Sequence, residues 1–379
     1  MEIFDVAVVG GGIAGASFAY RVAGRRSLVL LEAEAQVGYH STGRSAAEFS
    51  RQFQNETTGL LADASFDFLA APPAGFADVP LLTPRGNLVI ATGDRLPQLD
   101  AAFQEVRQTS PDTRMLSLDE AMDMVPFLRR DYMAGAFYDP ACWDMEVESI
   151  LQGYLRIARR NGADLRTGHP VSAVVRENGI YRLDTPQGPV LARTIVNTAG
   201  AWADRLAAMA GLGPLGIVPH RRTAITVDVP AEYDLARMPG VNELDESFYF
   251  KPEAGKLMVS PADATPSDPC DAQPEDLDVA YAAHFLEQST TLPIRTISHK
   301  WAGLRSFAPD KHQVVGFDSR DPGFFWLAGQ GGSGILTSPA LSEWAAGLFL
   351  DGAPPARLAR LGLQPTLFSP ARLLARPDT

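Results

Sequence analysis

The stretch Gly10-Gly11-Gly12-Ile13-Ala14-Gly15 lies between an apolar run that begins at Ile3 and a helix-forming stretch of small residues. Gly10 permits a tight turn, Gly12 lets a pyrophosphate approach the backbone, and Gly15 allows the helix to pack closely on the strand. The N-terminus of that helix then faces the phosphates. This pattern predicts a strand–turn–helix–strand unit over residues 3–35 that binds a dinucleotide.

An acid completes this fingerprint. Glu32 closes the next apolar run, Ser27–Leu31, at the position where an acid holds a ribose hydroxyl in dinucleotide-binding folds. A glycine-rich turn in some other α/β fold would leave this acid unexplained.

The size and composition of the chain limit its class. It has 379 residues, of which 46% are hydrophobic, so we expect two domains. The net charge of −12 argues against nucleic acid as a partner. The two cysteines, Cys142 and Cys270, indicate a reducing compartment, and neither stands in the spacing of a metal site. We therefore expect no bound metal.

The distribution of apolar residues bears on location. The first strand begins almost at Met1, and no uninterrupted apolar run approaches the roughly 20 residues of a membrane helix. We expect a cytoplasmic monomer without an integral membrane segment, and peripheral contact with the inner membrane remains open.

Periodicity predicts the main elements and their order. Helices are expected over 56–70, 96–107 and 148–160, and Asn178-Gly179 predicts a tight hairpin. Nucleotide-binding elements stand at both ends and in the middle of the chain, with strand-rich segments between them. We therefore predict an α/β protein with a Rossmann-like domain and an interleaved α+β substrate domain on a mostly antiparallel sheet.

The two predicted domains are discontinuous in sequence. The dinucleotide-binding domain is expected to comprise residues 1–50, 145–215 and 306–379, and the substrate domain residues 51–144 and 216–305.

Three later features favour FAD over NAD(P) as the dinucleotide. Ser41–Ala47 offers hydroxyls and backbone amides close after the second strand, and Asn197–Trp202 ends a strand in small residues. Gly331-Gly332-Ser333-Gly334 opens the last long helix, whose N-terminal amides stabilise negative charge on a reduced flavin. An NAD(P)-dependent dehydrogenase remains an alternative.

These motifs carry a family resemblance. Gly38–Ala47, Asp245–Tyr249, Trp301–Phe307 and the loop around Gly331-Gly332 resemble the D-amino-acid-oxidase (glycine-oxidase-like) flavoproteins, and among them the bacterial D-arginine dehydrogenases. The similarity runs over essentially the whole chain. It implies FAD held without a covalent bond. The residues expected to bind FAD are Gly10, Gly12, Ala14, Gly15, Glu32, Ala33, Ser41, Thr42, Gly43, Arg44, Ser45, Ala46, Ala47, Glu48, Val171, Gly200, Gly331, Gly332, Gly334, Ile335 and Leu336.

Strand alternation singles out two carboxylate-binding candidates. Arg222 shares a strand face with Ala224 and Thr226, and Tyr249 lies opposite the apolar pair Phe248 and Phe250. An arginine and a tyrosine on one sheet face can grip a carboxylate, the arginine as a bidentate fork.

Arg305, in Gly303-Leu304-Arg305, is a third candidate, and the resemblance agrees on all three. It implies that Arg222 and Tyr249 hold the substrate carboxylate and that Arg305 lines the site near the flavin. We assign a structural role to His40.

The resemblance implies oxidative deamination of D-amino acids. Hydride would pass from Cα to flavin N5, and the imino acid would hydrolyse to a 2-oxo acid and ammonia. Whether the acceptor of the electrons is a quinone or oxygen is left open. Oxidation of glycine, sarcosine or another secondary amine is one alternative, and a non-catalytic flavin-binding protein is another.

The residues expected to bind the substrate are Glu48, Phe53, Asn87, Gly332 and Ser333, and all of them except Gly332 depart from the family pattern. Asn87 replaces a glutamate that in the relatives meets a cationic side chain, Glu48 replaces a histidine, and Phe53 and Ser333 replace tyrosines. The departures predict a preference for D-amino acids broader than arginine, with neutral, hydrophobic and basic side chains left open.

Restoring the missing acid tests this interpretation. Asn87→Glu is expected to raise selectivity for D-arginine over D-leucine, because it returns a partner for guanidinium. The measurement is the ratio of the two kcat/KM values, and an unchanged ratio would contradict the interpretation.

Overall fold

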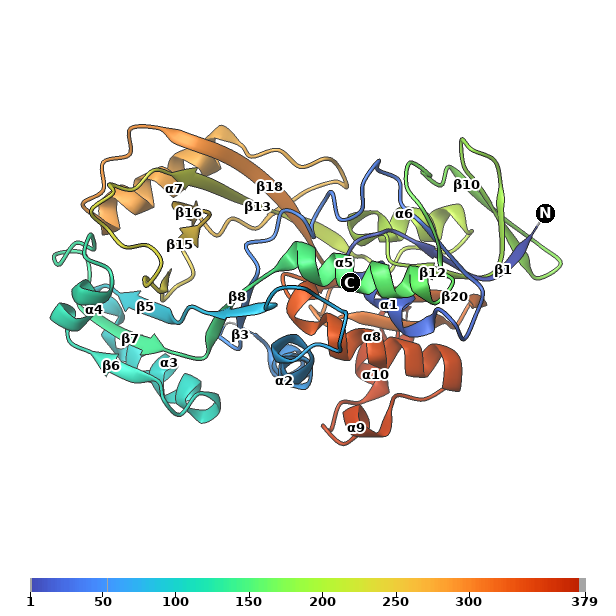
Figure 1. Ribbon diagram of the computed structural model, residues 1–379, viewed down its shortest axis with the longest axis horizontal. Helices are drawn as coiled ribbons and strands as arrows, with labels where there is room; N and C mark the ends of the chain where they lie inside the picture. The colour runs from blue at the N-terminus through green and yellow to red at the C-terminus, as the bar shows by residue number, and fades with distance from the viewer. Residues whose placement is uncertain (1, 53, 375–379) are drawn as a thin grey trace.

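The computed structural model describes residues 2–52 and 54–374. It divides into two lobes, each built on a large sheet (Figure 1). Within the described residues, no helix combines the length and the apolar character needed to cross a bilayer.

The sheet of the first lobe is the predicted Rossmann-like layer. Its parallel core runs in the order β20, β12, β1, β2 and β9, and β19 and the β10–β11 hairpin add antiparallel pairs. The central strands are apolar on both faces because helices cover both sides of a parallel sheet. The strands are β1 (Ile3–Val9), β2 (Leu28–Leu31), β9 (Asp164–Arg166), β10 (Ala173–Glu177), β11 (Ile180–Asp184), β12 (Val190–Asn197), β19 (Val314–Asp318) and β20 (Asp321–Ala328).

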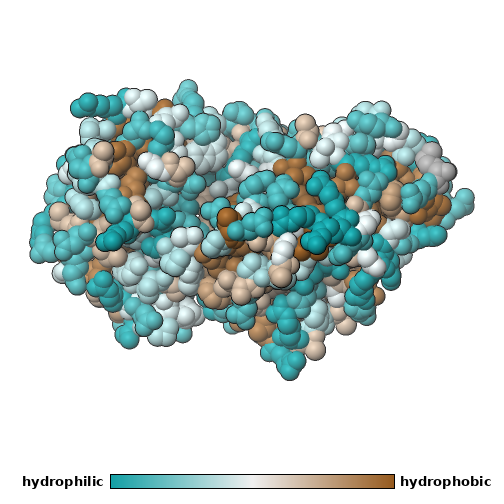
Figure 2. Space-filling view, viewed as in Figure 1, coloured by the Kyte–Doolittle hydropathy of each residue, from teal (hydrophilic) through white to brown (hydrophobic). Residues whose placement is uncertain are grey.

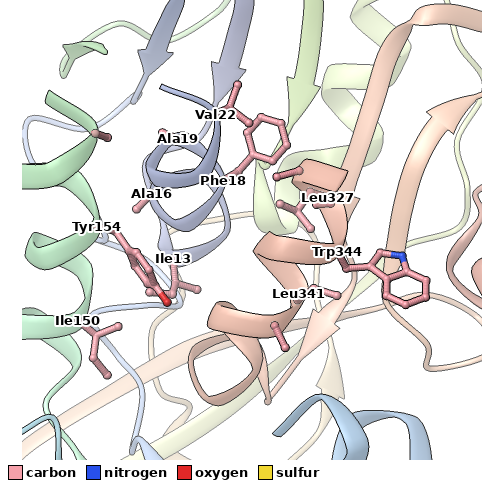
Figure 3. Packing of buried hydrophobic residues seen from close by; sticks show 14 of the residues in the cluster. Ile13, Ala16, Phe18, Ala19, Val22, Ile150, Tyr154, Leu327, Leu341 and Trp344 are labelled. Atoms are coloured by element: carbon pink, nitrogen blue, oxygen red, sulfur yellow. The ribbon is translucent and has the colours of Figure 1, made fainter. Parts of the chain in front are cut away.

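Three long helices contribute to the core on one side of this sheet. They are α1 (Ile13–Val22), α5 (Val147–Arg160) and α8 (Gly334–Asp351). Phe18 of α1, Tyr154 of α5 and Trp344 of α8 are fully buried in one cluster (Figure 3). The polar side of α5 forms a hydrophilic band across the middle of the surface (Figure 2), so this helix is amphipathic as its periodicity predicts.

The predicted hairpin is confirmed. Asn178 and Gly179 join β10 to β11 with φ of 51° and 79°. Both values lie in the left-handed region that a two-residue type I′ turn requires.

The second lobe holds a larger, mostly antiparallel sheet. Its order is β21, β18, β13, β16, β15, β14, β5, β7 and β6, with β17 also beside β13, and the β14–β5 pair is parallel. The strands are β5 (Asn87–Ala91), β6 (Arg114–Leu116), β7 (Gly135–Asp139), β13 (Val218–Val227), β14 (Gly240–Glu243), β15 (Tyr249–Glu253), β16 (Lys256–Ser260), β17 (Thr265–Pro266), β18 (Ile297–Phe307) and β21 (Gln330–Gly331).

One face of this sheet is covered by helix α7 (Asp276–Ser289). Phe248, Phe250 and Ile225 point to it and pack with Val279 and Leu286 of the helix. Side chains that alternate with these residues point to the opposite face, which is therefore free to line a site.

The remaining elements connect the lobes and complete the chain. A small sheet joins β3 (Glu48–Ser50), β8 (Cys142–Met145) and β4 (Leu82–Pro84). The other helices are α2 (Glu56–Ala70), α3 (Leu96–Thr109), α4 (Leu118–Met124), α6 (Ala203–Met209), α9 (Ala356–Ala359), α10 (Pro365–Phe368) and α11 (Ala371–Leu374), with 3-10 turns at Gly93–Arg95 and Gly200–Trp202.

We retain the discontinuous domain division as a proposal with one change. Leu61, Ala62 and Leu69 of α2 pack in the core of the first lobe. We therefore assign α2 to the dinucleotide-binding domain, although its sequence lies within the segment 51–144.

Candidate active site

A cavity of about 480 Å³ joins the predicted dinucleotide turn to the predicted carboxylate-binding residues. Its size lies within the range of small-molecule sites, roughly 300–1,000 Å³. The predicted cofactor residues that line it are Gly10, Gly12, Ala14, Glu32, Ala33, Ser41, Thr42, Arg44, Ser45, Ala46, Val171, Gly200, Gly331, Gly332, Gly334 and Ile335. Arg222, Tyr249 and Arg305 line the same cavity.

The glycine turn is packed as its sequence predicts. Gly10 has φ of 111°, and a Cβ on it would stand 2.4 Å from the carbonyl oxygen of Thr198. A Cβ on Gly15 would stand 2.0 Å from the carbonyl oxygen of Gly10. Neither position accepts a side chain, because in both cases the obstacle is backbone.

Glu32 and Thr42 hold the two sides of this turn. The Glu32 carboxylate accepts hydrogen bonds from the backbone amides of Gly11 at 2.7 Å and Glu34 at 2.9 Å. The Thr42 hydroxyl oxygen accepts from the amide of Ile13 at 3.0 Å, at the N-terminus of α1. Its own hydrogen remains available to a phosphate, so these residues fit a dinucleotide.

The segment 38–47 is fastened to β18 of the second lobe. The Ser41 hydroxyl donates to the Leu304 carbonyl at 2.6 Å, and the Trp301 indole donates to the Arg44 carbonyl at 3.1 Å. The Arg44 guanidinium forms an ion pair with Asp271. The positive charge of Arg44 is therefore paired with an acid of the protein, although Arg44 lines the cavity.

Five residues predicted to bind the cofactor do not line the cavity: Gly15, Gly43, Ala47, Glu48 and Leu336. Gly15 and Gly43 lie against the carbonyls of Gly10 and Gly38, and Leu336 is buried in the core. Ala47 and Glu48 turn toward β8, where the Ala47 carbonyl accepts from the amide of Met145 at 3.1 Å.

The far end of the cavity contains residues outside the predicted set of site residues. They are His169, Pro170, Trp202, Arg205 and Met209, together with Gln330 and Trp301 nearer the second lobe. The Trp202 ring lies 4.6 Å from that of His40, whose Nε2 is 3.0 Å from Glu34. Trp202 ends the predicted feature Asn197–Trp202, and Trp301 begins the motif Trp301–Phe307. These two features are the sequence signals for this group.

The loop before α8 is shaped by its contacts with β18. A Cβ on Gly331 would stand 2.3 Å from the Phe307 ring, and one on Gly332 would stand 3.2 Å from Cζ of Arg305. Ser333 does not line the cavity, and its hydroxyl donates to Gln54 Oε1 at 2.8 Å. Gly332 therefore lies directly against the Arg305 guanidinium.

Register brings the three carboxylate-binding candidates to one face of the larger sheet. Arg222 of β13 pairs with Gly303 of β18, and Arg305 stands two residues after Gly303 on β18. Tyr249 pairs with Ser260 on the face opposite Phe250. The predicted juxtaposition of the arginine and the tyrosine is present, and Gly303 leaves space beside Arg222.

The charges of these residues suit an anion. Burial raises the pKa of Tyr249, but the positive charges of Arg305 and Arg222 outweigh this effect, so its pKa is lowered. Burial and the like charge of Arg222 lower the pKa of Arg305 despite Tyr249. A carboxylate placed among the three groups would relieve the repulsion between the arginines.

Beyond Tyr249 the same sheet face carries small and polar residues. Asn242 lies opposite Tyr249, and Gly240 lies opposite Asn87. A Cβ on Gly240 would stand 3.7 Å from Glu48 Oε2 and equally far from Asn87 Oδ1. Phe53 lies outside the described residues.

Glu48 and Asn87 differ in how their polar atoms are used. The Cys142 thiol donates to Glu48 Oε1 at 2.8 Å, and burial raises the pKa of Glu48. Asn87 is fully buried, donates to Gln52 Oε1 and accepts from Asn242 Nδ2, both at 2.7 Å. Asn87→Glu would place an acceptor against Gln52 Oε1, so we expect that variant to lose stability as well.

The described part of the chain contains no group of three or more histidine, cysteine, aspartate or glutamate residues that could hold a metal ion. Neither Cys142 nor Cys270 lines the cavity.

Comparison with known proteins identifies the family. The DAO family model, described as FAD dependent oxidoreductase, matches residues 5–348. Glycine oxidase of Geobacillus kaustophilus (strain HTA426) is 25% identical over 352 residues, which cover 89% of this chain and 90% of the relative. Mitochondrial dimethylglycine dehydrogenase of Rattus norvegicus is 24% identical over 380 residues, 94% of this chain. The chain spans 44% of that longer relative.

Solved structures share the fold. Glycine oxidase from Geobacillus kaustophilus has a TM-score of 0.83 at 23% identity, with 100% of both chains covered. L-alpha-glycerophosphate oxidase from Mycoplasma pneumoniae, solved with FAD bound, has a TM-score of 0.80 at 18% identity over 93% of this chain and 95% of that chain. The predicted α/β fold and the FAD cofactor are thereby confirmed. The chain belongs to the DAO family of FAD-dependent oxidoreductases.

Proposed function

We propose that this flavoenzyme oxidises D-amino acids to imino acids, which water converts to 2-oxo acids and ammonia. The observation that carries the proposal is the cluster of Arg222, Arg305 and Tyr249 in the cavity that also contains the dinucleotide turn. FAD supplies the acceptor for the hydride that leaves Cα. The balance is one amino acid and one FAD giving one imino acid and one reduced flavin.

The residues of the chain bind and orient the substrate. Arg222 and Arg305 would hold the carboxylate, and Tyr249 would donate a hydrogen bond to it. Gly332 leaves space beside the Arg305 guanidinium, since a Cβ on residue 332 would crowd that group. Fixing the carboxylate also fixes the direction of the Cα–H bond, which is the main contribution that orientation makes to such a reaction.

The polar face beyond Tyr249 supports a substrate with a side chain. Asn242 lies opposite Tyr249, and Gly240 and Glu48 lie beyond it, outside the lining of the cavity. A substrate side chain that extends past Tyr249 would approach these residues, which glycine would not reach. The competing function is oxidation of glycine or an N-methylated amino acid. The names of the relatives, glycine oxidase and dimethylglycine dehydrogenase, favour it.

Turnover with an artificial electron acceptor separates the two functions. The panel contains D- and L-amino acids, glycine, sarcosine and dimethylglycine, and 2-oxo acid and ammonia are measured as products. We expect kcat/KM for the best D-amino acid to exceed that for sarcosine at least about tenfold, a difference of about 1.4 kcal/mol. Faster turnover of sarcosine or glycine would establish the alternative.

Glu48→Gln is expected to reduce selectivity for D-lysine over D-norleucine by about tenfold or more. The reason is that a hydrogen bond between charged groups contributes about 1.5–3 kcal/mol, and Glu48 Oε2 faces Gly240 on the proposed side-chain path. The measurement is the ratio of the two kcat/KM values. The matched control is Glu343→Gln on α8, outside the cavity, which removes the ion pairs of Glu343 with Arg357 and Arg21.

The pH dependence provides a second check on Glu48. Burial raises its pKa, and the carboxyl group is ionised only above that pKa. The selectivity for D-lysine should therefore fall as the pH is lowered through the raised pKa, and Glu48→Gln should abolish this dependence. A selectivity that Glu48→Gln leaves unchanged would remove Glu48 from the substrate site.

A further inference from the structure

The loop that follows β16 is fastened to β13 beside Arg222. The Asp263 carboxylate accepts from the Thr223 amide through Oδ1 at 2.6 Å and from the Thr223 hydroxyl through Oδ2 at 3.1 Å. The Ser260 hydroxyl donates to the Thr223 carbonyl at 2.6 Å. Ser260 at the end of β16 and Asp263 in the loop thus satisfy both backbone groups of Thr223, at the point where β13 changes partner from β16 to β17.

The same loop holds the guanidinium of Arg222. Arg222 Nε donates to the backbone carbonyl of Asp263 at 2.7 Å. Because Nε is occupied there, the forked end of the guanidinium remains for groups in the cavity, which Arg222 lines. The direction of that fork depends on where the Asp263 carbonyl lies.

The surroundings of Asp263 are crowded with charge. Its side chain is 7% exposed, and Arg221 Nε lies 3.9 Å from its Oδ2. Arg221 also pairs with Asp278 of α7 at 3.2 Å and with Glu275 at 2.5 Å. The Arg221 charge is therefore shared among several acids, whereas the two hydrogen bonds to Thr223 belong to Asp263.

The backbone of the loop is held in a conformation that needs such support. Ala262 has φ of 51°, in the left-handed region that a residue with a Cβ adopts at a cost. The Ala262 amide donates to Ser260 Oγ at 3.2 Å. Asp263 follows Ala262, and the two hydrogen bonds that Thr223 donates to its carboxylate hold it in place. The position of the Asp263 carbonyl is therefore fixed by the Asp263 side chain.

We propose that Asp263 is a positioning residue for the substrate carboxylate. Its side chain anchors the loop on Thr223, and its carbonyl thereby fixes the orientation of Arg222. The inference rests on the proposed function, since it takes Arg222 to be a carboxylate ligand. It assigns Asp263 a role that acts through Arg222 and involves no contact with the substrate.

Two substitutions of Asp263 separate the effect of its hydrogen bonds to Thr223 from the effect of its negative charge. Asp263→Ala removes both acceptors, so the loop is released from Thr223. Asp263→Asn keeps an oxygen for the Thr223 amide and offers an NH₂ to the Thr223 hydroxyl oxygen, so the anchor survives while the charge is lost. The probe is propionate, which carries the carboxylate of an amino acid and no amine, titrated into the FAD-loaded protein by calorimetry and by the flavin spectrum.

Asp263→Ala is expected to raise the Kd of propionate at least about tenfold, as for a lost hydrogen bond to a charged group. The rate of flavin reduction at saturating amino acid should change less than about threefold, because Arg305 and Tyr249 still orient the carboxylate of the bound substrate. Asp263→Asn should bind propionate within about threefold of the original protein. If Asp263→Ala retains no flavin, Thr223→Val replaces it, because that variant removes only the hydroxyl anchor.

A double-mutant cycle distinguishes positioning from general damage. In the Arg222→Ala background, Asp263→Ala should lower kcat/KM by less than about twofold, since the group that it positions is gone. An additive loss in that background would overturn the inference. So would an unchanged Kd in Asp263→Ala, or an Asp263→Asn variant as impaired as Asp263→Ala.

The outcomes also separate this inference from the proposed function. If propionate binds as expected but no D-amino acid reduces the flavin, the proposed function fails while the role of Asp263 stands. If the original protein binds no propionate, Arg222 is not a carboxylate ligand, and the inference about Asp263 is overturned.

Discussion

Arg222→Ala is expected to lower kcat/KM for the preferred amino acid by roughly 30- to 5,000-fold. Removing one partner of a buried, hydrogen-bonded charge pair costs about 2–5 kcal/mol, and each 1.4 kcal/mol is about tenfold. Arg222 lines the cavity with Arg305 and Tyr249, and its loss leaves the substrate carboxylate a single arginine. The measurement is steady-state kinetics with a matched determination of bound FAD.

The neighbouring residue provides the control. Arg221 stands on the other face of β13 and does not line the cavity. It pairs with Asp278 and Glu275, and its Nε lies 3.9 Å from Asp263 Oδ2, whose hydrogen bonds to Thr223 do not involve Arg221. Arg221→Ala should change kcat/KM by less than about threefold, although it removes the same charge from the same strand. Equal losses in the two variants would indicate a general effect of positive charge and would contradict a specific carboxylate site at Arg222.

Gly15→Ala is expected to abolish retention of FAD and to destabilise the protein. The new Cβ would stand 2.0 Å from the Gly10 carbonyl oxygen and 2.9 Å from Thr198 Oγ1. Since the first obstacle is backbone, the turn at the N-terminus of α1 must open, and overpacking of this kind costs about 1–3 kcal/mol or more. The measurements are the FAD content after purification and the Tm.

Gly93→Ala is the matched control for this substitution. A Cβ on Gly93 would meet Ala134 at an ordinary 3.7 Å, and its φ is not in the left-handed region. The variant should keep FAD and change the Tm little. A Gly15→Ala protein that purifies with a full complement of FAD would contradict the packing that we describe for the turn.

The sequence predicts those parts of the fold that depend on local patterns. The unit over 3–35, the hairpin at Asn178-Gly179 and the helix 56–70 follow from periodicity and turn chemistry, and the structure contains each of them. The faces of Arg222 and Tyr249 follow from the two-residue alternation of strands, so their juxtaposition needs only the two strands to share a sheet.

Contacts between distant segments could not be predicted in this way. The motif assigns Arg44 to the cofactor, yet the Arg44 guanidinium pairs with Asp271, 227 residues further along the chain. Asp263 stands in a loop without a motif and reaches Arg222 only because β16 folds back beside β13. Glu48 was assigned to both cofactor and substrate, and the β3–β8 pairing turns it toward Cys142.

The most direct test of the proposed function is anaerobic mixing of the purified protein with D- and L-amino acids while the visible spectrum is recorded. We predict loss of the oxidised flavin absorbance with D-amino acids and none with their L-enantiomers, and Arg222→Ala should suppress the loss at the same substrate concentration. A flavin spectrum that no D-amino acid bleaches, or that sarcosine or glycine alone bleaches, would contradict the function that we propose for this site.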